Sequence, residues 1–167
     1  MNSSNGRRRP ARLAGVVVAV ALATACTADA PDAPVEQEGQ GFVEGEGYIA
    51  EYEQAAEALE WPGGVEPPGP SPDAGTSYQV GVGESQATME WNCAWGREWL
   101  SLREQGGDEA DHALEMYAGF LETRTFREMF DPESAQPVVR QIVEDARLGD
   151  PSGVQRDVET NCPTDGR

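Results

Sequence analysis

Residues 84–102, ESQATMEWNCAWGREWLSL, decide the fold of this chain. Three tryptophans and a leucine recur in this stretch at helical spacing: Trp91, Trp95, Trp99 and Leu102. The spacing predicts a helix over residues 84–105, with Ser85 as its N-cap and Gly106-Gly107 as its end. The stripe is predicted to be core, because a small helical domain needs large apolar side chains inside. The alternative is an exposed face that stacks on a glycan or peptide, which makes Trp91, Trp95 and Trp99 the candidate binding surface.

Three more helices are predicted downstream. One spans residues 108–123, the next opens at Asp131-Pro132 or Ser134, and a short last one starts at Asp150-Pro151. Their apolar faces hold Ala110, Ala113, Leu114, Tyr117 and Leu121, then Val138, Val139, Ile142, Val143 and Ala146, then Val154 and Val158. The pattern predicts an all-α domain over residues 78–167, a small bundle of about four short helices.

Upstream of residue 78 the chain is predicted to be mostly irregular. Residues 48–60 are good helix formers and predict one short helix, which ends at Trp61-Pro62. Residues 65–77 are rich in proline and predict a coil draped over the domain or a second linker. Residues 26–47 are acidic and poor in large apolar side chains, so they are predicted to form a disordered tether.

The first 25 residues predict a signal peptide. Four arginines within residues 7–12 form a positively charged start, and an apolar run follows over residues 13–23. The run is too short to cross a bilayer, which needs roughly 20 residues. We therefore expect the mature protein to lie outside the cytoplasm.

Ala23-Thr24-Ala25-Cys26 resembles a bacterial lipobox. In that motif the cysteine receives a diacylglyceryl group and becomes the mature N-terminus, although Ala23 stands where the motif usually has leucine. Lipidation of Cys26 would hold the protein on the outer face of the cytoplasmic membrane. The alternative is ordinary cleavage, with the protein secreted and Cys26 free.

The three cysteines of the chain are Cys26, Cys93 and Cys162. An odd count in an exported protein needs an explanation, and lipidation of Cys26 leaves an even pair. Cys93 and Cys162 are then predicted to form a disulfide in an oxidising compartment. Neither lies in a Cys-x-x-Cys motif, which disfavours redox chemistry at free thiols.

The mature chain is strongly acidic. Four of the 12 basic residues precede Cys26 and all 30 acidic residues follow it, which leaves a net charge of −22 after cleavage. Such a charge repels nucleic acid and anionic lipid, so nucleic-acid binding is excluded.

The second half of the chain resembles small exported lipoproteins of actinobacteria. The resemblance lies in residues 78–102 with their Cys-Ala-Trp run, in residues 149–154 and in the terminal Asn161-Cys162-Pro163. The stretch Trp61 to Val65 extends the resemblance more loosely. No activity is known to us for that group, so the resemblance implies the disulfide and the compartment and carries no mechanism.

Few residues suggest catalysis or metal binding. His112, the single histidine, could hold a cation together with Asp108, Asp111 and Glu115, but acids along one helix face are more often simply solvated. There is no Gly-x-Ser-x-Gly motif, and no phosphate-loop lysine because the chain lacks lysine. Gly81 and Gly83 predict a tight turn ahead of a helix. No cofactor is predicted.

These observations favour a lipid-anchored envelope protein that acts as a non-catalytic binding module, with another envelope protein or a glycan as its partner. The alternative is a small cell-wall hydrolase that uses carboxylates, which are abundant but form no distinguished pair. A third hypothesis is a structural lipoprotein whose anionic tether organises cations near the wall.

Overall fold

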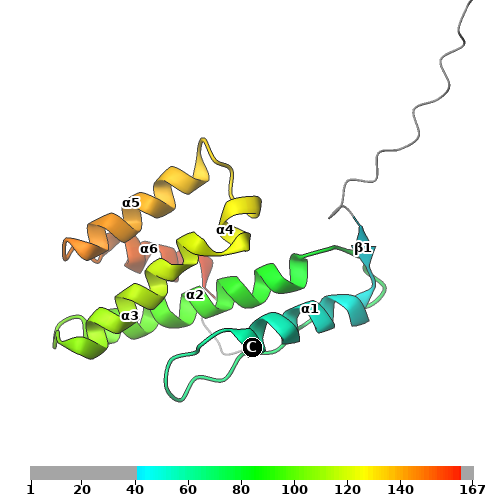
Figure 1. Ribbon diagram of the computed structural model, residues 1–167, viewed down its shortest axis with the longest axis horizontal. Helices are drawn as coiled ribbons and strands as arrows, with labels where there is room; N and C mark the ends of the chain where they lie inside the picture. The colour runs from blue at the N-terminus through cyan, green and yellow to red at the C-terminus, as the bar shows by residue number, and fades with distance from the viewer. Residues whose placement is uncertain (1–40, 163–167) are drawn as a thin grey trace, which may run out of the picture. The chain divides into compact units, whose positions relative to one another are not determined.

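The computed structural model describes residues 41–162. The predicted signal peptide, Cys26 and the tether up to residue 40 lie outside the described residues. The described part holds six α-helices, one 3-10 helix and two short strands. In chain order these are β1 (Phe42–Val43), α1 (Gly45–Ala58), β2 (Tyr78–Gln79), α2 (Val82–Leu102), α3 (Asp108–Ala118), η1 (Gly119–Glu122), α4 (Arg124–Met129), α5 (Ala135–Arg147) and α6 (Ser152–Asn161). The predicted all-α class is confirmed (Figure 1).

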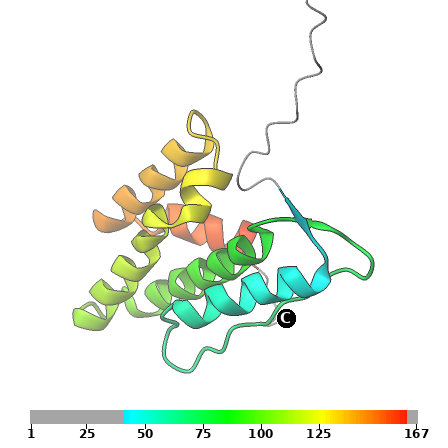
Figure 2. The same ribbon diagram turned by 45° about the vertical axis from the view of Figure 1, so that its right-hand side comes forward.

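Helix α2 is the central element of the fold. It packs against α1, α3, α4 and α6, while α5 covers α3 and α6 (Figure 2). The tryptophan stripe faces the core that these helices enclose, together with Tyr117, Phe120 and Phe126. The indole nitrogens of Trp91 and Trp95 both donate to the carbonyl oxygen of Glu60, at 2.5 and 2.8 Å. The stripe on α2 therefore also fixes the chain just after α1.

Helix α1 belongs to the same folded unit, which corrects the predicted domain start at residue 78. It begins at Gly45, inside the predicted tether, and packs along α2 through Tyr52 and Ala56. The close approach needs a glycine: a Cβ on Gly83 would lie 2.9 Å from the Tyr52 nitrogen and 2.8 Å from Glu51 Cβ. The close packing of α1 on α2 depends on one glycine of α2, and the composition of residues 45–58 does not reveal it. The sequence therefore predicted that α1 lies outside the domain.

The proline-rich segment is draped over the domain and is not a free linker. The Gly69 nitrogen donates to the Tyr52 hydroxyl at 3.1 Å, and the Asp73 nitrogen donates to the Tyr78 hydroxyl at 2.5 Å. The ring of Tyr78 stacks on that of Tyr48 with their centroids 4.4 Å apart. The segment then enters β2, which pairs antiparallel with β1.

Several helix ends differ from prediction. Helix α2 begins after Gly81, whose φ of 93° suits glycine, so Ser85 as N-cap was wrong. The Glu51 carboxylate accepts from the nitrogens of Gly81 and Gly83 and satisfies the first turn of α2 from the neighbouring helix. The helix predicted over residues 108–123 stops at Ala118 and continues as η1. Helix α4, capped by the Thr123 hydroxyl, was not predicted.

Cys93 and Cys162 form the predicted disulfide, with their Cα atoms 5.6 Å apart. The bond joins the middle of α2 to the end of α6. Among residues 41–162, no helix is long and apolar enough to cross a membrane.

Candidate functional site

The candidate binding surface formed by Trp91, Trp95 and Trp99 is not exposed. Their exposed fractions are 4%, 5% and 5%, so the interpretation as core is correct and the surface platform is wrong. The physical reason is the position of α2, which is surrounded by other helices. These helices cover the face of α2 that carries the tryptophans, so a ligand cannot reach it.

The candidate cation site on α3 is not assembled. Among the described residues, no three His, Cys, Asp or Glu side chains lie close enough to hold a metal ion. The His112 ring instead packs edge-on against Trp95, with 5.3 Å between ring centroids, and its Nε2 lies 3.7 Å from a Glu60 carboxylate oxygen. Asp108 and Asp111 lie in the first turn of α3, where negative charge favours the helix dipole.

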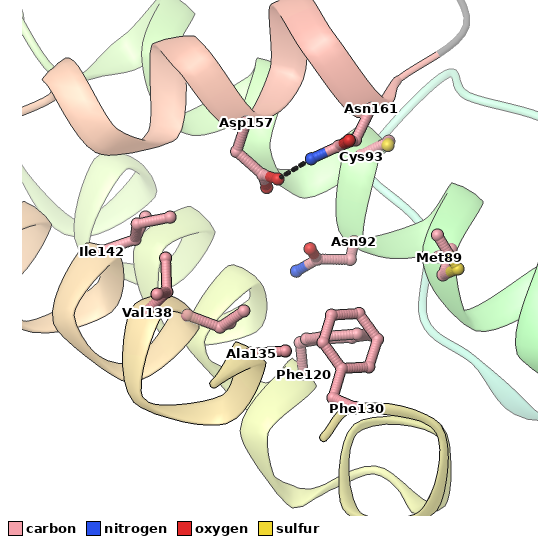
Figure 3. A pocket seen from close by; sticks show the side chains of 11 residues that line it. Met89, Asn92, Cys93, Phe120, Phe130, Ala135, Val138, Ile142, Asp157 and Asn161 are labelled. Atoms are coloured by element: carbon pink, nitrogen blue, oxygen red, sulfur yellow. Dashed lines mark hydrogen bonds between the residues drawn. The ribbon is translucent and has the colours of Figure 1, made fainter. Parts of the chain in front are cut away.

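The structure instead has an open, largely apolar pocket of about 350 Å³ between α2, α5 and α6 (Figure 3). One wall comes from apolar residues of α5, and the floor comes from Phe120 of η1 and Phe130 after α4. The opposite edge is polar and comes from α2 and α6. The residues that line the pocket are Met89, Asn92, Cys93, Phe120, Phe130, Ala135, Val138, Val139, Ile142, Asp157 and Asn161.

The apolar wall exists because α5 carries a wider apolar face than the core can cover. Val143 and Ala146 are buried, Val139 and Ile142 are half-buried, and Val138 remains 58% exposed. Large exposed apolar side chains that border a concave surface are typical of a binding site.

Hydrogen bonds hold the α4–α5 connection and the backbone of Phe130 in place. The Gln136 side chain donates to the Phe130 carbonyl oxygen at 3.0 Å. Asp131 accepts from the backbone nitrogens of Glu133 and Ser134 and from the Ser134 hydroxyl. These hydrogen bonds lower the pKa of Asp131. The Phe130 ring packs edge-on against Phe120 at 5.5 Å, which fixes the floor of the pocket.

The polar edge is a connected chain of hydrogen bonds across three helices. Asn92 on α2 donates from Nδ2 to the Tyr117 carbonyl oxygen at 3.0 Å. The Tyr117 hydroxyl donates to Asp157 Oδ2 at 2.9 Å, and Asn161 donates to Asp157 Oδ1 at 2.8 Å. Burial and the adjacent Asp157 carboxylate raise the pKa of Tyr117, so this hydroxyl stays a donor. The Cys93–Cys162 bond lies beside this network and fixes the end of α6.

A second pocket of about 400 Å³ lies between α1, α2 and the start of α4. It contains two carboxylates, which makes it the place to look for the predicted hydrolase chemistry. Glu51, however, caps the first turn of α2, and Glu84 pairs with Arg124 at 3.0 Å. Both carboxylates thus have structural partners, and neither is arranged as a free acid or base.

Only part of the α2–α5–α6 pocket could be predicted from the sequence. The apolar face of α5 was predicted, but as core. Asn92 and Asp157 were not singled out, because polar residues inside two helices give no pattern until the tertiary contacts bring them together. No protein-family model, curated protein or solved structure matches this chain.

Proposed function

We propose that this protein is exported, is anchored to the outer face of the cytoplasmic membrane through a lipid on Cys26, and acts there as a non-catalytic binding module. The observation that carries the binding role is the α2–α5–α6 pocket. Its volume of about 350 Å³ lies within the range of small-ligand sites, and it has the usual composition of an apolar lining with a few converging polar groups.

Two features support the extracytoplasmic location. The N-terminal 25 residues have the charge and apolar length of a signal peptide. The Cys93–Cys162 bond is of the kind that persists in oxidising compartments. With this pair bonded, Cys26 is the one cysteine of the chain left for a lipid.

Anchoring is tested by mass spectrometry of the full chain expressed in a bacterium that processes lipoproteins. The expected result is a diacylglyceryl mass on an N-terminal Cys26 and recovery in the membrane fraction. Cys26→Ser should lose both. A wild-type chain recovered without lipid from the medium would contradict the anchor but leave the binding role intact.

The binding role is tested by site-specific photocrosslinking in intact envelopes. A photoreactive residue at Met89, which lines the pocket and is 42% exposed, is expected to capture an envelope component. The matched control is the same group at Leu148, which is 82% exposed and does not line the pocket. Equal products from both positions would contradict a binding site at the pocket.

The alternative, a carboxylate-dependent cell-wall hydrolase, makes a different prediction. It would need Glu51 or Glu84 of the second pocket, and Glu51→Gln or Glu84→Gln would then abolish release of wall fragments by the full chain. The structural partners of both carboxylates favour the binding module.

A further inference from the structure

We propose that the α2–α5–α6 pocket binds a small cationic amphiphile: an ammonium group attached to a compact apolar body. The inference rests on the proposed binding function and names the class of ligand for that site. It follows from the pairing of an apolar wall with a polar edge that carries the Asp157 carboxylate and no cationic side chain among the lining residues.

The apolar half of the pocket determines the body of the ligand. Phe120 and Phe130 form the floor, and Val138 and Ile142 form one wall (Figure 3). Val138 is 58% exposed, so the fold leaves apolar surface that a ligand would remove from water. An aromatic or branched group fits such a floor, because edge-on packing on phenylalanine rings is favourable.

The polar half determines the charge of the head group. Each oxygen of Asp157 accepts one hydrogen bond, from Tyr117 and from Asn161, and a carboxylate offers about four acceptor sites. No ion pair to Asp157 exists among residues 41–162. The half-buried Asp157 carboxylate beside the apolar pocket is therefore stabilised by hydrogen bonds alone. A bound cation would neutralise its charge.

Asn92 adds a second acceptor at the same edge. Asn92 is 9% exposed, and one N–H of its Nδ2 donates to the Tyr117 carbonyl oxygen. No group in the described part of the chain donates a hydrogen bond to the amide oxygen, Asn92 Oδ1. An ammonium carries three N–H donors, enough for Asp157 and Asn92 together, whereas an alcohol carries one.

The net charge of the protein also favours a cationic ligand. A mature chain with a net charge of −22 attracts cations and repels fatty acids and anionic lipids. Glu90 lines the adjoining pocket of about 300 Å³, which shares Met89, Cys93 and Asn161 with the first, and adds negative charge on that side.

The test uses the full chain with Cys26→Ser, purified without detergent, and two probes with the same body. These are 2-phenylethylamine and its neutral analogue 2-phenylethanol, titrated by calorimetry and by NMR. The amine is expected to bind at least about tenfold more tightly than the alcohol, since a charge-assisted hydrogen bond is worth that much. The Asn92 side-chain amide signal should shift during the titration. Equal affinity for the two probes, or no binding of the amine, would overturn the proposal.

Asp157→Asn should remove the preference for the amine, so that the amine and the alcohol bind with similar affinity. The matched control is Glu159→Gln, which removes one negative charge from an exposed position of the same helix outside the pocket. A preference that survives in Asp157→Asn overturns the role of the carboxylate.

A second variant covers the case in which Asp157→Asn does not fold. Val138→Arg places a positive charge at an exposed pocket position and should abolish amine binding, whereas Leu148→Arg adds the same charge outside the pocket and should not. Amine binding retained in Val138→Arg overturns the proposal. If the amine does not bind but crosslinking from Met89 in envelopes is lost in Val138→Arg, the ligand class is wrong and the binding function stands.

Discussion

The Tyr117 hydroxyl donates a 2.9 Å hydrogen bond to Asp157 Oδ2 and so joins α3 to α6 at the polar edge of the pocket. Tyr117 is only 2% exposed, and the bond places a neutral phenol directly against a carboxylate. The same tyrosine accepts from Asn92 through its carbonyl oxygen, so one residue organises both polar groups of the pocket.

This arrangement predicts a loss of stability in alkali. Burial first, and then the Asp157 carboxylate, raise the pKa of Tyr117 far above its ordinary value of 10.0. Above pH 10 the unfolded chain has lost this proton while the folded chain keeps it, so the free energy of unfolding falls as pH rises. Each such tyrosine contributes about 1.4 kcal/mol per pH unit there.

Urea unfolding at about pH 9 and about pH 11 measures the effect. Tyr117→Phe should be less stable than wild type at the lower pH, because it loses the bond to Asp157. It should lose less further stability on going to the higher pH. Equal losses in the two proteins would show that Tyr117 ionises alike in the folded and unfolded states.

Tyr52 is a second buried tyrosine of this kind, since burial and its hydrogen bond to Glu90 also raise its pKa.

The disulfide should provide a large share of the stability of the fold. It closes a loop with a sequence separation of 69, and constraining the unfolded chain to that extent is worth about 4 kcal/mol. Reduction should lower the free energy of unfolding in urea by that amount. The double variant Cys93→Ala/Cys162→Ala is the control, because reductant should leave its unfolding curve unchanged. A wild-type curve insensitive to reductant would contradict a stabilising bond.

Much of the helical framework could be predicted from the sequence, because it depends on local periodicity. The tryptophans, spaced four residues apart and so about one helical turn, predicted α2, and Asp150-Pro151 predicted the start of α6. The disulfide followed from cysteine arithmetic. These signals lie within one segment or in a simple count, so no tertiary information was needed.

Most of the features that sequence analysis missed depend on contacts between distant segments. Helix α1 has few strongly apolar residues, and its place in the fold comes from small side chains and from tyrosines that hydrogen-bond to α2, such as Tyr48 to Gln86 and Tyr52 to Glu90. Helix α4 has six residues, too short for a periodic signal. The pocket combines an asparagine of α2 with an aspartate of α6, which are 65 positions apart in the numbering.

The contact between α1 and α2 makes Gly83 a sensitive position. A Cβ there would meet backbone atoms of α1, the oxygen of Tyr48 and the nitrogen of Tyr52, which cannot rotate away. Gly83→Ala should therefore destabilise the fold by about 3 kcal/mol or more, at the upper end of overpacking effects. Gly63→Ala is the matched control, because a Cβ at that position meets nothing within 4 Å. Thermal unfolding of both variants measures the difference. Similar melting temperatures for the two would contradict the close packing of α1 on α2.

The burial of the tryptophans predicts the fluorescence of the native protein. Trp91, Trp95 and Trp99 are at most 5% exposed, and Trp61 is partly buried with its indole bonded to the Ala56 carbonyl oxygen. Emission should therefore be blue-shifted, and iodide should quench the native protein several-fold less than the urea-unfolded chain. The negative charge of the protein also repels iodide, so neutral acrylamide is the control quencher and should show the same order. Strong quenching of the native protein by acrylamide would mean that the indoles form an open platform. The stability of Trp95→Ala also distinguishes a core tryptophan from an exposed one. Removing a core indole lowers the free energy of unfolding by about 3–5 kcal/mol, whereas removing an exposed indole changes it little.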